Sequence, residues 1–206
     1  VPMGKVADIV GRKRVFFIGN IILTLASILC AISFSAPMLL ASRVVQGIGA
    51  SMVFGTSMAL ITSAFPPYER GKAIGIAVSS VYLGLSVAPV LGGVLTQYLG
   101  WRSLFYTTIP VSIFVIVATL RCLKTEWAEA KGEKFDFKGS VIYVVFMSML
   151  MVGFTRLPDP LAIVITAIGV VGLVVFVLVE LRVEPPVLSI SLIRNNRVFA
   201  LSNLAA

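Results

Sequence analysis

The chain has 206 residues, 58% of them hydrophobic, and its mean hydropathy is +1.02. A soluble fold of this composition would expose far more apolar surface than soluble domains do, so the composition excludes an ordinary soluble globular protein. The formal net charge of +8 does not indicate nucleic-acid binding, because the basic residues are spread over several loops without interleaved aromatic side chains.

Charged side chains are nearly absent from six long stretches of the chain. A bilayer's hydrocarbon core is about 30 Å thick and requires roughly 20 apolar residues per helix, and a charge at its centre costs a few kcal/mol. We therefore expect an all-α fold, a polytopic transmembrane helix bundle. Its expected spans are residues 15–35, 38–65, 73–98, 103–120, 139–155 and 161–179, and a further helix begins near Val198.

The basic residues predict the orientation of these spans. All but three of the 17 lysines and arginines fall in loops on one side of the arrangement, and the exceptions are Arg43, Arg102 and Arg156. Because short basic loops are retained in the cytoplasm during insertion, the basic side is expected to be cytoplasmic. The predicted location is the inner, cytoplasmic membrane of the cell, with the lipid bilayer as a partner.

This topology predicts five regions. They are a cytoplasmic loop (1–14), four transmembrane helices (15–121), a solvated cytoplasmic connector (122–138), two further transmembrane helices (139–181), and a cytoplasmic interfacial stretch that leads into another helix (182–206). The chain lacks an initiator methionine and stops inside a new apolar run, so we expect a piece of a longer polypeptide. No charged segment at its start leads into a cleavable hydrophobic region, so we expect no signal peptide. Cys30 and Cys122 are expected at opposite depths and unpaired, and no residue cluster has metal-ligand spacing.

The first loop combines glycines, cations and a single carboxylate. Gly4 and Gly11 suit a tight turn, and the cations, which include Lys13, orient the next span. Asp8 is suited to accept hydrogen bonds from a helix N-terminus or from a neighbouring arginine such as Arg12. Such a pair would latch one conformation.

Arg43 lies inside the second expected span, about one turn past its external end. Its side chain can snorkel to the interface. Gln46 follows three residues later, and small residues continue the same helix face, which favours a packed or cavity-lining face. The same periodicity makes Val53 and Ser57 candidates for lining a cavity.

The third expected span carries a repeat of small residues. Gly84, Ala88 and Gly92 recur every four residues, and Pro89 and Gly93 lie beside them. Small residues on one face permit close helix contact, and the proline frees a backbone carbonyl, so the pattern predicts a tight crossing with a kink.

These motifs together resemble the major facilitator superfamily. The first loop matches its G-x-x-x-D-x-x-G-R-[RK] signature through five residues, Gly4, Asp8, Gly11, Arg12 and Lys13. In that family this loop joins charge contacts that close the cytoplasmic side. The resemblance implies this gating role for Asp8 and Arg12, with their partner in the other half of the transporter, outside this chain.

Other segments resemble particular branches of that family. Residues 43–50 are similar to the R-x-x-Q-G-x-G-A segment of proton-driven facilitators, which implies that Arg43 and Gln46 take part in proton coupling. Residues 84–95 resemble the antiporter signature of drug:proton exporters, with Ala88 in place of a glycine. Residues 100–112 resemble a segment of the fourteen-span branch, although Thr108 and Ser112 depart from its pattern. Residues 135–139 resemble another segment of that branch. We expect Asp136, within this second segment, to cap the helix that follows.

The resemblance implies a partial major facilitator fold that comprises spans three to eight of fourteen. It also implies a secondary active transporter of the multidrug type, not an enzyme, that exports small amphipathic or cationic compounds by proton antiport, with the proton gradient as its energy source and no cofactor. No Asp or Glu lies inside the expected spans, so the protonated acid is expected outside this chain. The alternatives are an importer or symporter of a nutrient and, more remotely, a membrane enzyme or assembly subunit.

Overall fold

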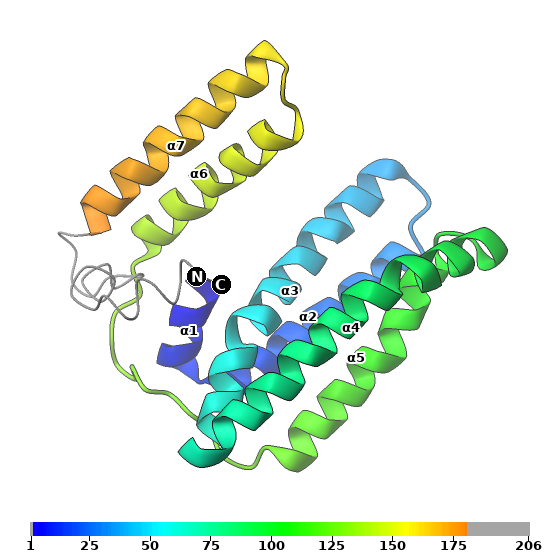
Figure 1. Cartoon of the computed structure of the whole chain (residues 1–206), viewed down its shortest axis with the longest axis vertical. Coiled ribbons are helices and arrows are strands. Elements are labelled where there is room, and N and C mark those ends of the chain that lie inside the picture. Colours follow the sequence, from blue (N-terminus) through cyan, green and yellow to red (C-terminus); the bar gives the residue numbers. More distant parts are fainter. Residues whose placement is uncertain (1, 181–206) are drawn as a thin grey trace. The chain divides into compact units, whose positions relative to one another are not determined.

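The computed structural model describes residues 2–180, and the regular structure among them is helical (Figure 1). Residues 3–131 form one compact unit, and the described residues from 132 onward belong to another. The expected interfacial stretch and the helix near Val198 lie outside the described residues. The helices are α1 (Pro2–Val10), α2 (Arg12–Ala31), α3 (Ala36–Ala64), α4 (Pro67–Leu99), α5 (Ser103–Cys122), α6 (Phe137–Thr155) and α7 (Pro160–Glu180).

The six helices α2 to α7 are each long and apolar enough to cross a membrane. The expected all-α, polytopic fold is therefore confirmed. The largest difference in a span concerns α4, which begins at Pro67, six residues before the expected start. Proline suits the first turn of a helix, and Glu69 in that turn interacts favourably with the helix dipole, so the helix extends through its charged first turn.

The first loop differs from the expectation more strongly. Residues 2–10 are a helix rather than a loop, and Ala7 of this helix is buried against Val15 and Met52. The turn is confined to Gly11, whose φ of 125° is a conformation that only glycine adopts readily. A short helix and one glycine thus replace the expected tight turn.

In the first unit, α2 packs against both α3 and α5 (Figure 1). Glycines permit its close approach to α3, because a Cβ atom at Gly19 would lie 2.7 Å from Cβ of Met52 and one at Gly49 would lie 2.7 Å from the backbone nitrogen of Leu23. By contrast, α4 buries none of its residues.

The helices α2 to α5 alternate in direction, so the turn at Gly11, the α3–α4 turn and the end of α5 share one end of the unit. We call this the basic end, after Arg12, Lys13, Arg14, Arg70, Lys72 and Arg121.

The second unit contains the hairpin of α6 and α7 (Figure 1). A Cβ atom at Gly169 would lie 2.8 Å from the backbone nitrogen of Leu150, and one at Gly172 would overlap the ring of Phe146. The start of α6 confirms the capping role expected for Asp136, because its Oδ1 accepts a hydrogen bond of 2.9 Å from the backbone N–H of Gly139. Small residues and a cap therefore define this hairpin.

Candidate functional site

Arg12 is the centre of a charged cluster at the basic end. Its Nε donates to Oδ1 of Asp8 at 2.8 Å, and its Nη1 and Nη2 donate to the two carboxylate oxygens of Glu129 at 2.8 and 2.7 Å. Nη1 also donates to Oγ of Ser63 on α3 at 2.6 Å. The Arg12 side chain is only 9% exposed. Charge-assisted bonds, two of them in the planar fork that suits a carboxylate, therefore compensate for the burial of this guanidinium.

The connector after α5 supplies much of this cluster. The backbone carbonyl of Trp127 accepts from the Arg12 N–H at 2.8 Å, and the Ala130 N–H donates to the carbonyl of Asp8 at 2.9 Å. Oε1 of Glu126 accepts from the Lys13 N–H at 2.9 Å. Residues 126–130, which we call the connector strap, thus lie against the corner between α1 and α2.

This arrangement adds two contacts that were not expected. The first part of the connector hydrogen-bonds to the signature segment, and its Glu129 side chain stays 69% exposed. A partner of Arg12 lies within the chain, on the connector strap, instead of only in another half of a transporter. Sequence reasoning missed Glu129 because its contact spans 117 positions; the available signal was a pair of acids, Glu126 and Glu129, in the connector next to a basic loop.

The other signature residues have structural positions in the same corner. A Cβ atom at Gly4 would lie 3.4 Å from the carbonyl oxygen of Gly55, so this glycine keeps α1 close to α3. Gly11 makes the turn, and Lys13 contributes its backbone N–H. The five signature residues are therefore brought together at one corner of the unit.

Arg43 and Gln46 form a second polar cluster, toward the opposite end. Nη1 of Arg43 donates to Oε1 of Gln46 at 2.9 Å, and Nε2 of Gln46 donates to Oγ of Ser27 on α2 at 2.9 Å. The guanidinium also lies over the ring of Phe105 on α5, with Cζ 4.8 Å from the ring centroid. The pairing of Arg43 with Gln46 follows from their helical spacing, whereas the contributions of Ser27 and Phe105 come from other helices and were not predicted.

The weaker candidates on α3 are engaged in helix contacts. The Cγ2 of Val53 would lie 3.2 Å from a Cβ atom at Gly19, so this side chain faces α2. The Ser57 hydroxyl donates to the carbonyl of Val53 at 2.6 Å. A cavity-lining role for Val53 and Ser57 stays a prediction.

The small-residue face of α4 is open within the first unit. A Cβ atom at Gly84 or Gly93 would meet nothing within 4 Å, and one at Gly92 would lie 3.6 Å from Cδ2 of Leu104. Pro89 lies inside the helix and Ala88 is exposed. The expected tight crossing is therefore not made by another helix of residues 3–131.

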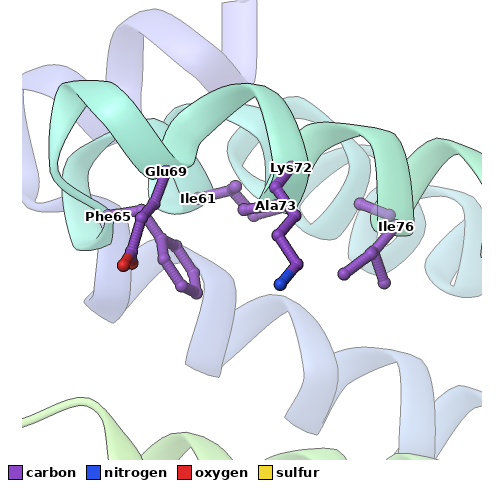
Figure 2. A pocket seen from close by; sticks show the side chains of 7 residues that line it. Ile61, Phe65, Glu69, Lys72, Ala73 and Ile76 are labelled. Atoms are coloured by element: carbon purple, nitrogen blue, oxygen red, sulfur yellow. The ribbon is translucent and has the colours of Figure 1, made fainter.

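A cleft of about 420 Å³ lies where α3 ends and α4 begins. Figure 2 shows Glu69, Lys72 and Ile76 projecting from α4 on the side of the Phe65 ring. The lining is apolar apart from one acid and one base. Ile61, Ala73 and Ala77 complete it.

Other reactive side chains are few within residues 2–180. No group of three or more His, Cys, Asp or Glu residues in this range is placed to hold a metal ion. Cys30 is buried and Cys122 is exposed, and both are free thiols. Glu180, the last residue of α7, is a carboxylate only 3% exposed that the sequence did not single out; its Oε2 would lie 3.1 Å from a Cβ atom at Gly139, near the N-terminus of α6.

The helices and their charged turns are those of a multi-pass membrane protein. The chain belongs to the Major Facilitator Superfamily, whose family model matches residues 1–204. Members of this family are transporters rather than enzymes.

Named relatives are similar over nearly the whole chain. It is 31% identical to "Riboflavin transporter RibZ" of Clostridioides difficile, over 98% of this chain and 44% of that protein. It is 34% identical to "Multidrug resistance protein Stp" of Mycobacterium tuberculosis, over 92% of this chain and 36% of that protein. It is 31% identical to "Multidrug resistance protein 3" of Bacillus subtilis, over 98% of this chain and 40% of that protein. The chain thus spans less than half the length of these curated relatives.

Proposed function

We propose that the chain forms spans three to eight of a fourteen-span secondary active transporter in the cytoplasmic membrane. The transporter exports small amphipathic or cationic compounds in exchange for protons. It moves them by rocking two helix bundles around a site near the membrane midplane. The observation that carries this proposal is Arg43, a cation within an apolar helix that is hydrogen-bonded to Gln46 and, within residues 2–180, has further N–H groups to offer.

Two features support export by antiport. Relatives with about one-third identity are named multidrug resistance proteins. Residues 84–95 resemble the antiporter signature, and the exposed small-residue face around Gly84 and Gly93 can receive a helix from the remainder of the transporter. In this proposal, the face forms a contact that rearranges during transport.

The Arg12 cluster is proposed to close the cytoplasmic side. Asp8, Ser63 and Glu129 fix the guanidinium from three different segments, so that α1, α3 and the connector strap are joined at one point. Opening this side in the transport cycle would require some of these charge-assisted bonds to break. The cluster therefore favours the conformation in which it is intact.

Arg43 is proposed to serve proton coupling. A guanidinium has five N–H donors, and within residues 2–180 Arg43 uses one of its donors, toward Gln46. The remaining donors can stabilise the ionised form of an acid in spans outside this chain. Protonation of that acid would then weaken its hold on Arg43 and link proton movement to the rocking of the bundles.

Import or symport of a nutrient is the second candidate function. The observation that favours it is the relative named a riboflavin transporter, which is as similar to this chain as a multidrug resistance protein is. Antiport and symport differ in the direction in which a proton gradient drives the substrate.

Reconstitution of the complete transporter in proteoliposomes separates the two candidates. With the membrane potential clamped to zero and an acidic lumen, antiport drives ethidium, a lipophilic cation, into the vesicles, and Arg43→Gln abolishes this accumulation. Symport instead concentrates riboflavin in the lumen when the outside is acidic. Accumulation that is unchanged after the pH gradient is collapsed would contradict both forms of proton coupling.

A further inference from the structure

Two aromatic rings, with an arginine at each end, connect the α4–α5 turn to α3. Cζ of Arg102 lies 4.3 Å from the ring centroid of Trp101, and Cζ of Arg43 lies 4.8 Å from that of Phe105. The two rings meet edge to face, with centroids 6.1 Å apart and an interplanar angle of 89°. The chain of contacts is therefore Arg102, Trp101, Phe105 and Arg43.

Phe105 is held firmly within this chain. Its side chain is 5% exposed and packs with Cys30 and Ala31 of α2. Trp101 holds the ring from a perpendicular direction, and Arg102 ties its own turn to the turn between α2 and α3 by donating to the carbonyl of Ser33 at 2.7 Å. The Phe105 ring thus presents a fixed face to Arg43.

The guanidinium is also held by an amide. Oε1 of Gln46 accepts a hydrogen bond from Nη1 of Arg43. Nε2 of Gln46 donates in turn to Oγ of Ser27, which is fully buried. Arg43 therefore contacts both an aromatic face and an anchored amide, although it is a long and otherwise flexible side chain. A cation over an aromatic face gains an attraction worth about 2- to 30-fold in an equilibrium constant.

We propose that Phe105 is the positioning residue for Arg43. The ring holds the guanidinium so that its remaining N–H groups face the position of an anionic group, and it does so without touching the substrate or the proton. The inference rests on the proposed role of Arg43 in proton coupling. It adds that the strength of coupling depends on the electron density of the Phe105 ring.

Stepwise fluorination of Phe105 in the complete transporter tests this role. Mono-, di- and trifluorophenylalanine keep the size and packing of the ring nearly constant but progressively weaken its negative face. Proton-driven ethidium accumulation is expected to fall stepwise along the series, by up to about 10-fold, toward the value of Phe105→Leu. The same series at Phe114, an exposed residue of α5, is the matched control and should change nothing.

A second readout tests the contact independently of transport. In a variant whose other cysteines, including Cys122, are replaced by serine, the midpoint temperature of maleimide labelling of the buried Cys30 reports unfolding around Phe105. Fluorination should lower this midpoint when Arg43 is present and leave it unchanged in the Arg43→Gln background. Equal shifts in the two backgrounds would show that Phe105 acts through packing alone and would overturn the inference.

The two readouts also separate this inference from the proposed function. If fluorination lowers the labelling midpoint only when Arg43 is present, but transport is unaffected by the proton gradient, the contact is supported. Proton coupling is then refuted, and with it the positioning role. Proton-driven transport that is equal along the fluorination series would retain the proposed function and overturn the role of Phe105.

Discussion

The bond between Arg12 and Glu129 gives a stability prediction that follows directly from geometry. Glu129 accepts two charge-assisted hydrogen bonds from Arg12, at 2.8 and 2.7 Å. In Glu129→Gln the amide oxygen can still accept one of them, while the second bond and the charge attraction are lost. Loss of a bond to a charged group costs about 1.5–3 kcal/mol, but the Glu129 side chain is 69% exposed, and an exposed ion pair contributes only about 0–1 kcal/mol.

We therefore expect Glu129→Gln to destabilise the protein by about 1 kcal/mol. For a chain of this length that corresponds to a fall in Tm of about 2–4 °C. The assay is the midpoint temperature of Cys30 labelling in detergent, in a Cys122→Ser background. The difference should shrink in 1 M salt, because water surrounds much of the Glu129 carboxylate.

Lys131→Gln is the matched control, since it also removes one charge from an exposed residue of the connector. Its midpoint should remain near that of the parent protein. If Glu129→Gln and Lys131→Gln have equal midpoints, the connector strap does not hold Arg12, and the description of the basic-end cluster is wrong.

Three further changes have expected outcomes that thermal unfolding followed by circular dichroism would check. Gly169→Ala places a Cβ atom 2.8 Å from the backbone nitrogen of Leu150 and should lower the free energy of unfolding by about 1–3 kcal/mol. Its control, Gly75→Ala, meets nothing within 4 Å and should be neutral or stabilising by up to about 1 kcal/mol. Equal effects of the two changes would contradict close packing of α6 on α7. Asp136→Ala removes the cap of α6 and should cost about 1 kcal/mol, while Asp136→Asn keeps an acceptor and should cost less. Ser27→Ala leaves the Gln46 amide without its buried partner and should cost about 1–3 kcal/mol, in contrast to Ser51→Ala on the exposed face of α3.

The membrane-spanning helices could be predicted because the exclusion of charge from a bilayer acts on each segment separately. The limits of α4 could not be predicted from charge alone, since a helix can continue past the hydrocarbon into water and carry Glu69 and Lys72 on its first turns. The helix α1 escaped prediction for another reason. Its glycine and charges suggest a turn, and its burial against Val15 and Met52 depends on residues distant in sequence.

In the polar clusters too, contacts within one helix could be predicted from the sequence, whereas contacts between distant segments could not. Asp8 with Arg12 and Arg43 with Gln46 are four and three residues apart, so helical geometry brings each pair together and the sequence reveals them. Glu129 approaches Arg12 only because α5 returns the chain to the basic end. Contacts of that kind depend on how several helices pack, and no local pattern encodes them.

Both proposed roles require the two ends of the first unit to lie on opposite sides of the membrane, with the basic end in the cytoplasm. Cysteines introduced singly as Tyr98→Cys and Lys131→Cys, in a protein without other cysteines, test this requirement with a membrane-impermeant maleimide. Tyr98→Cys should be labelled in intact cells, and Lys131→Cys only after the cells are permeabilised. Labelling of both positions in intact cells, or of neither, would place the two ends in one compartment and contradict the membrane topology on which the account rests.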